Sequence, residues 1–229
     1  MRIAIYYTPT PDQPLAQAGA SWLGRDAFSG ALRQPGLPDE QIASARRYGF
    51  HATIRAPFRP IEGVSIDMAD GRLADLCRTC PPAVITRLTL ARLGSFLALV
   101  PDRPEPSLET LQRSVLEGFE PIRRPLEPDE RARRRPERLS EVERRFLDEW
   151  GYPYVLDAFR FHLTLTDALD DAALDKAELL ARSHFAQFID RPLTIDRLAL
   201  FVEPDAGAAF RVHGSHTLSK ILQPIEDHA

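Results

Sequence analysis

The chain has 229 residues, of which 44% are hydrophobic and 27% are charged, proportions that favour a folded globular protein and argue against a disordered or fibrous one. Its formal net charge of -4 argues against sequence-independent binding of long nucleic acid, which depends on a broad basic surface. No apolar run is long enough to cross a bilayer, and the first residues resemble a strand more than a signal peptide, so we expect a cytoplasmic protein.

The first third of the chain contains two strand patterns separated by a helical region. A strand is predicted over 2–7, and one or two short helices over the Ala- and Leu-rich stretch 14–33. Residues 47–56 alternate between apolar and polar side chains, which predicts a second strand that ends at Pro57. The apolar face of this strand can pack on a core, and its polar face carries His51, Thr53 and Arg55.

The middle of the chain begins with a predicted helix over about 65–80. Cys77 and Cys80 lie near its end, and we interpret them as two reduced thiols, because no second Cys pair completes a zinc site. Two strands follow, over 84–92 and 95–100, joined by a tight turn at Gly94 and Ser95.

A helix capped by Ser107 is predicted to run to about Phe119, after a linker from Pro101 to Pro106. The arginines of the following segment, 127–150, alternate with acidic residues at helical spacing. This pattern favours a solvated pair of helices. The functional alternative is a rim that attracts anions, formed by Arg131, Arg133, Arg134 and Arg135.

The last third of the chain resembles the first. Residues 159–166 alternate as a strand whose polar face carries His162, Thr164 and Thr166. A helix over 171–188 and strands over 193–202 and 209–217 follow. The last strand contains His213 and His216, whose odd separation predicts opposite faces, so we assign neither of them a role.

The two halves repeat one plan, in which a strand bearing a histidine is followed by a helix and two strands. An Arg-Leu-x-Leu sequence begins at Arg87 and again at Arg197, at nearly the same distance along the chain after His51 and after His162. The repeat predicts two related lobes whose histidines face one another across a pseudo-twofold axis.

The residues shared by the two strands suit phosphoester chemistry. In each His-x-Thr sequence, alternation puts the imidazole and the hydroxyl on the same face. Cleavage of a phosphodiester needs a base to activate the nucleophile and an acid to protonate the departing alkoxide, and His51 and His162 can fill both roles without a metal ion. The hydroxyls of Thr53 and Thr164 can hold non-bridging oxygens, and the guanidinium of Arg55 would offset charge at phosphorus.

One such pair alone would more often be a solvated or hydrogen-bonded feature of a strand, but two pairs in matching contexts favour a site. The motifs, within RYGFHATIRAPF and WGYPYVLDAFRFHLTLT, resemble the two-histidine phosphoesterase superfamily, and more closely its branch of phosphonate-metabolism proteins associated with carbon-phosphorus lyase pathways. The resemblance covers nearly the whole chain.

The resemblance implies a bilobal α+β fold, with two antiparallel sheets lining a central cleft and helices on the outside. It implies catalysis by His51 and His162, phosphate binding by Thr53 and Thr164, no cofactor, and a ribose cyclic phosphate or related phosphoester as substrate. We expect one domain over 1–229, made of three parts: a first-motif lobe over about 40–100, a helical segment over about 105–150, and a second-motif lobe over about 155–220.

Tyr48 and Tyr154 lie near the motifs and are further candidates for ligand contact. Two other functions remain open: an RNA-end 2′,3′-cyclic phosphodiesterase or ligase, and a non-catalytic module that binds a phosphorylated metabolite. The expected partner is a small phosphorylated molecule. The sequence does not indicate the physiological substrate, the reaction direction, which histidine is the acid, or the oligomeric state.

Overall fold

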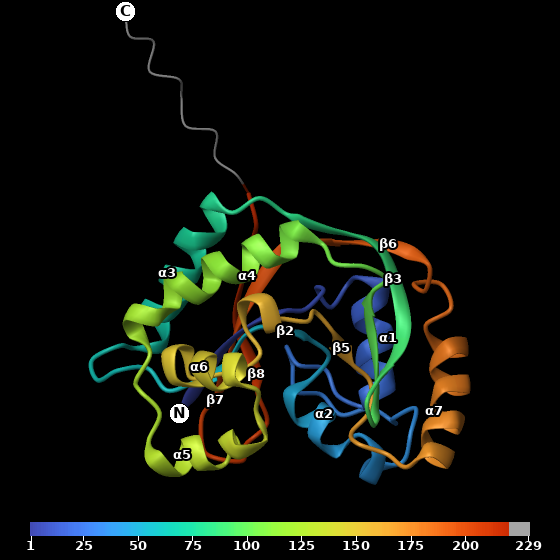
Figure 1. The fold of residues 1–229 in the computed structure, drawn as a ribbon. Helices are drawn as coiled ribbons and strands as arrows, with labels where there is room; N and C mark the ends of the chain where they lie inside the picture. The colour runs from blue at the N-terminus through green and yellow to red at the C-terminus, as the bar shows by residue number, and fades with distance from the viewer. Residues whose placement is uncertain (220–229) are drawn as a thin grey trace, which may run out of the picture.

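The structure, a computed structural model, describes residues 1–219, so residues 220–229 of the expected domain lie outside the described part. Within the described part, eight antiparallel strands form one curled sheet (Figure 1). Their order across the sheet is β6 (Arg191–Ile195), β3 (Ala83–Leu93), β4 (Phe96–Pro101), β5 (Leu163–Thr164), β2 (Ala52–Phe58), β1 (Arg2–Tyr7), β7 (Arg197–Glu203) and β8 (Arg211–Thr217).

Helices pack around this sheet. They are α1 (Pro14–Leu23), α2 (Ala43–Tyr48), α3 (Ile66–Thr79), α4 (Pro106–Phe119), α5 (Pro128–Ala132), α6 (Glu141–Trp150) and α7 (Asp171–His184). The helix α3 contacts β7 and β8, α4 contacts β2 and β3, and α7 contacts β4 at the other side of the molecule (Figure 1). Over residues 1–219, none of the helices has both the length and the apolar character needed to cross a membrane.

The predicted α+β fold with antiparallel strands is confirmed, but the two expected sheets are joined into one. They are joined because Leu163 of β5 pairs with Ala52 of β2 on one side and with Leu99 of β4 on the other. The strand order is symmetric about the boundary between β5 and β2. The two strands that carry Arg-Leu-x-Leu, β3 and β7, stand third from this boundary on opposite sides.

Strand pairing also crosses the two expected lobes. The strands β3 and β4, from the first half of the chain, lie on the side of the second motif, whereas β7 and β8 lie on the side of the first. Each half of the sheet is therefore built from both parts of the chain.

The first motif strand starts and ends later than predicted. The helix α2 continues to Tyr48, Gly49 adopts a φ of 80°, and β2 then runs through Pro57 instead of ending there. Pro57 fits because the register against β1 shifts between the partners of Ile3 and Ile5, and such a bulge tolerates a residue that has no N–H to donate.

Two other predicted strands were wrong in extent. The strand expected over 159–166 is reduced to β5, and the strand expected over 193–202 divides at Asp196 into β6 and β7. The division is needed because β6 pairs with β3 whereas β7 pairs with β1 and β8.

The helices agree more closely with the sequence analysis. The helical pair within 127–150 is confirmed as α5 and α6. The stretch 14–33 contains only α1, because Gly24 adopts a left-handed φ of 71° and ends it. The helix α4 starts at Pro106, so Ser107 lies inside its first turn and is not the cap. The last helix, α7, ends at His184.

The core lies between the sheet and the helices, and the end of α3 is part of it. Leu73 and Cys77 of α3 are fully buried, as are Val115 and Phe119 of α4. Cys77 and Cys80 are free thiols, and burial raises the pKa of Cys77 to about 12, which keeps this thiol protonated and unreactive.

The two histidines of β8 face the same helix, and the prediction of opposite faces was wrong. Nε2 of His213 lies 3.2 Å from Oδ1 of Asp67, and Nε2 of His216 lies 2.9 Å from Oδ1 of Asp70. The reason is a register shift next to Gly214, where β8 gains a residue against β7 and the alternation reverses. Both histidines therefore join β8 to α3.

We expect Gly19→Ala to destabilise the protein by about 1–3 kcal/mol, because a Cβ there would overlap the ring of Phe50, which packs below the first motif. The measurement is urea unfolding. The control is Gly71→Ala on α3, where nothing lies within 4 Å of the new Cβ and a stabilisation of about 0.5–1 kcal/mol is expected. Equal effects of the two substitutions would contradict the packing described here.

Candidate active site

The two motifs lie side by side because their strands are neighbours. Ala52 of β2 pairs with Leu163 of β5, and both side chains are fully buried in the core. The residues that flank this pair point to the opposite face of the sheet. Antiparallel pairing gathers the motif residues there in two cross-strand pairs: His51 with Thr164, and Thr53 with His162.

Each imidazole is fixed by the same local hydrogen bond. Nδ1 of His51 donates to the carbonyl of Gly49, and Nδ1 of His162 donates to the carbonyl of Arg160, each over 2.8 Å. Because a carbonyl only accepts, the Nδ1 atom carries the proton in both neutral rings and Nε2 has a free lone pair. The hydroxyl of Thr53 lies 3.3 Å from Nε2 of His51 and can donate to it.

Both histidines are held in the neutral form. Burial lowers the pKa of His51 to about 4, against the Gly49 carbonyl that raises it, and a positive charge on His162 lowers it further. Burial also lowers the pKa of His162, while the carbonyl of Arg160 acts in the opposite direction. A bound phosphate would supply the negative charge that favours protonation of either ring.

A cavity of about 610 Å³ opens on the motif face. His51, Thr53 and Thr164 line it, and Tyr48 lines it as well. His162 is not among the lining residues, but its ring centroid lies 5.9 Å from that of Phe96, which does line the cavity. The structure thus brings His51, Thr53 and Thr164 to one cavity, with His162 beside a residue that lines it.

Aromatic rings form one wall of this cavity. Tyr6 stacks on the imidazole of His51 with 3.9 Å between ring centroids, and the ring of Tyr48 lies 5.8 Å from the same imidazole. On another side, the guanidinium of Arg134 lies over the ring of Tyr152 at 5.2 Å, and both residues line the cavity. Arg134 therefore brings a positive charge to the compartment that holds the motifs.

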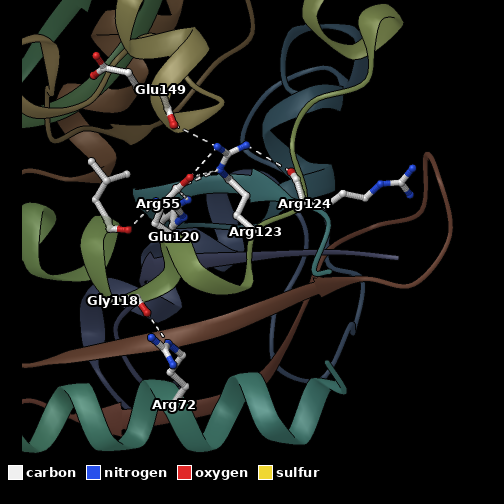
Figure 2. A network of polar contacts seen from close by, with 8 residues as sticks. Arg55, Arg72, Gly118, Glu120, Arg123, Arg124 and Glu149 are labelled. Carbon is white, nitrogen blue, oxygen red and sulfur yellow. Dashed lines mark hydrogen bonds and ion pairs between the residues drawn. The ribbon is translucent and has the colours of Figure 1, made fainter. Parts of the chain in front are cut away.

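Arg55 does not reach the cavity, so its prediction as a substrate ligand was wrong. Its side chain is 3% exposed, and it donates to the carbonyl of Leu116 over 2.9 Å and to Glu120 over 2.7 Å. Figure 2 shows Arg55 and Arg123 converging on Glu120, and Arg123 also reaches the carbonyl of Glu149.

A bulge explains the change of face. The register between β2 and β1 shifts between the partners Thr53 and Arg55, which adds one residue to β2 and reverses its alternation. As a result Ala56 lines the cavity in the place where strict alternation had put Arg55.

Tyr154 was also predicted to contact the ligand, but Tyr152 lines the cavity instead. Tyr154 is 46% exposed, does not line the cavity, and meets the ring of Tyr152 edge-on. Sequence reasoning missed Tyr152 and Tyr6. Tyr6 had a usable signal, because alternation along β1 puts it on the face opposite the core residues Ile5 and Tyr7.

The arrangement suits proton transfer at a phosphoester. Two neutral imidazoles with a lone pair on Nε2 can exchange protons with a substrate, and the hydroxyls of Thr53 and Thr164 lie in the cavity beside them. Over residues 1–219, no group of three or more His, Cys, Asp or Glu side chains is arranged to hold a metal ion.

The chain matches the family model described as "Protein of unknown function (DUF1045)" over residues 53–211. It is 38% identical over 221 residues to a ribose 1,5-bisphosphate phosphokinase PhnN of Janthinobacterium sp. (strain Marseille), covering 91% of this chain and 49% of that protein. The PhnN of Laribacter hongkongensis (strain HLHK9) is 37% identical over 222 residues, covering 93% and 50%. The chain therefore spans about half the length of these relatives.

Two solved structures are similar to this chain over most of its length. One is a crystal structure of a phosphoesterase, with a TM-score of 0.45 and 11% identity over 95% of this chain and 98% of the other. Another is E. coli LigT complexed with 3'-AMP, with a TM-score of 0.46 and 11% identity over 95% and 97%.

We expect Arg55→Met to lower the free energy of unfolding by about 2–3 kcal/mol, because it removes two charge-assisted hydrogen bonds from a buried site. Urea unfolding measures this loss. Arg145→Met is the control, since its guanidinium is exposed and lies 4.0 Å from Glu149, a geometry worth less than about 1 kcal/mol. If Arg55→Met left the stability unchanged and weakened ligand binding, the structural role assigned to Arg55 would be wrong and Arg55 would be a ligand residue.

Proposed function

We propose that this chain, which belongs to the DUF1045 family, is a metal-independent phosphoesterase. Both motif threonines and His162 lie inside the region that the family model matches. The proposed substrate is a cyclic phosphate or phosphodiester of a small ribose-containing metabolite, in phosphonate metabolism. One observation carries the proposal: the pairing of Ala52 with Leu163, which aligns the two His-x-Thr motifs on one face of the sheet.

In the proposed reaction, Nε2 of neutral His51 takes a proton from water as the water oxygen bonds to phosphorus. His162, protonated once the phosphate is bound, gives its proton to the ester oxygen as the P–O bond breaks. His51 is chosen as the base because its burial against Tyr6 and its low pKa keep it unprotonated. The hydroxyls of Thr53 and Thr164 bind the non-bridging oxygens.

The cavity supports a small substrate. Its volume of about 610 Å³ lies within the range of sites for metabolites, which is roughly 300–1,000 Å³. Tyr48 and Tyr152 offer flat faces for a sugar or a base, and Arg134 brings a positive charge that suits an anionic substrate. The name of the curated relatives refers to ribose 1,5-bisphosphate, which supports a ribose phosphate as the substrate class.

The kinase activity in that name does not suit this chain. Kinases of the P-loop type use a Gly-Lys pair followed by Ser or Thr to hold nucleotide phosphates, and this chain contains no Gly-Lys pair. We therefore assign the kinase activity to the part of the longer relatives that this chain does not match.

Replacing either motif histidine should nearly abolish turnover. We expect His51→Ala and His162→Ala each to lower kcat by about 10²–10⁴-fold, because each removes one proton-transfer group, and we expect full activity in chelator. The assay is a screen of cyclic phosphates and phosphodiesters. His213→Ala, which alters a histidine on the α3 side of the sheet, should keep its activity. Activity that is lost in chelator and kept in both motif variants refutes the proposal.

The pH dependence of kcat/KM should be bell-shaped and displaced to low pH. The base must be neutral, so activity rises as pH increases through the pKa of His51 at about 4. The acid must be protonated, so activity falls as pH increases through the pKa of His162, which is lowered from its ordinary 6.5. Initial rates at low substrate concentration measure both limbs. A single limb, or an alkaline limb well above pH 6.5, would contradict these roles.

A further inference from the structure

A second cavity, of about 220 Å³, is lined mainly by arginines. Five guanidiniums contribute to its walls, against one carboxylate, that of Glu130; they are those of Arg2, Arg59, Arg124, Arg133 and Arg134. Such a concentration of positive charge contrasts with the net charge of -4 of the whole chain. Like charges held together this closely repel one another unless an anion lies between them.

Three of these guanidiniums have carboxylate partners. Arg59 lies 3.1 Å from Glu130, Arg2 pairs with Glu203, and Arg124 pairs with Glu127. The remaining two do not: within residues 1–219, no carboxylate lies within 4.0 Å of the guanidinium of Arg133 or Arg134. Two positive charges at this cavity are thus left for a ligand to balance.

The arginines come from segments that the fold holds in place. The N–H of Arg124 donates to the carbonyl of Arg59 over 2.8 Å, which ties two lining residues together. The neighbouring Arg123 is fixed by Glu120 and by the carbonyl of Glu149, while the side chain of Arg124 points away from that network (Figure 2). The chain then turns at Arg135, which has a φ of 50° and follows the two unpaired arginines.

The second cavity adjoins the motif cavity. Tyr48, Pro57 and Arg134 line both of them, so the two spaces share one wall. A single small molecule can therefore have one group beside His51 and another among the arginines. Guanidinium groups bind phosphate oxygens in bidentate pairs, which makes a phosphate monoester the best match for this second group.

We propose that the arginine-lined cavity binds a second phosphate of the substrate, so that the molecule cleaved at the histidines is a phosphoester that also carries a phosphate monoester. This inference rests on the proposed function. It narrows the substrate class from ribose phosphoesters in general to doubly phosphorylated ones. A dianionic monoester balances the two unpaired guanidiniums, whereas a phosphodiester supplies only one negative charge.

The test compares kcat/KM for three substrates: a ribose cyclic phosphate with a free 5-hydroxyl, the same compound with a 5-phosphate, and one whose 5-phosphate is esterified to a nucleoside. We expect the 5-phosphorylated compound to be preferred at least about tenfold over the other two. We expect Arg133→Gln to lower that preference about tenfold, because it removes an unpaired guanidinium. Arg113→Gln, an exposed arginine of α4 that lines neither cavity, should keep the preference.

A second measurement does not depend on turnover. Titration calorimetry with ribose 5-phosphate should show binding to the unmodified protein and to Arg113→Gln, weakened about tenfold in Arg133→Gln. If turnover requires His51 but kcat/KM is the same with and without the 5-phosphate, the inference is wrong and the proposed function still holds. A preference for the nucleoside diester would overturn the inference in favour of an oligonucleotide end. A third outcome would contradict the proposed function itself: ribose 5-phosphate binds in a way that depends on Arg133, but no substrate is turned over in a way that depends on His51.

Discussion

The pairing of a two-residue strand with its neighbour decides where the histidines lie. Because side chains alternate along a strand, a slip of β5 by one residue would turn His162 into the core and Leu163 out of it. Hydrogen bonds just beyond the strand hold this register. The N–H of Leu165 donates to the carbonyl of Leu97 over 2.8 Å, and the indole N–H of Trp22 donates to the carbonyl of Leu165 over 2.8 Å. The backbone N–H of Leu97 in turn donates to the hydroxyl of Thr166.

Alternation in the sequence was enough to find the motif face and most of the strands. It failed where a bulge adds a residue, because nothing in the local pattern marks the extra one. For this reason Arg55 pairs with Glu120 instead of lining the cavity, and His213 and His216 both contact α3. It also could not foresee that β5 would join two groups of strands into one sheet, since that depends on pairings between residues far apart in the chain.

The net charge of the chain does not show how its charged side chains are distributed. The acidic composition argues against long nucleic acid, yet Arg59, Arg124, Arg133 and Arg134 gather around a cavity that adjoins the motif cavity. The sequence analysis had favoured a solvated helical pair for the segment 127–150 and kept an anion-attracting rim as the alternative. The structure contains the helical pair, and it also brings Arg133 and Arg134 to the cavity walls. Arg131, by contrast, pairs with Asp148, and the attraction of anions by this segment stays a prediction.

The hydrogen bond from each imidazole to a carbonyl two residues earlier makes the motif self-contained. Histidines are often oriented by a carboxylate from a distant part of the chain, whereas main-chain atoms of the same short segment orient His51 and His162. A main-chain acceptor is present whatever side chain stands at that position, so residues as different as Gly49 and Arg160 serve equally well. Such a unit needs no partner from elsewhere in the chain, so the same orientation of an imidazole can be built twice in one sheet.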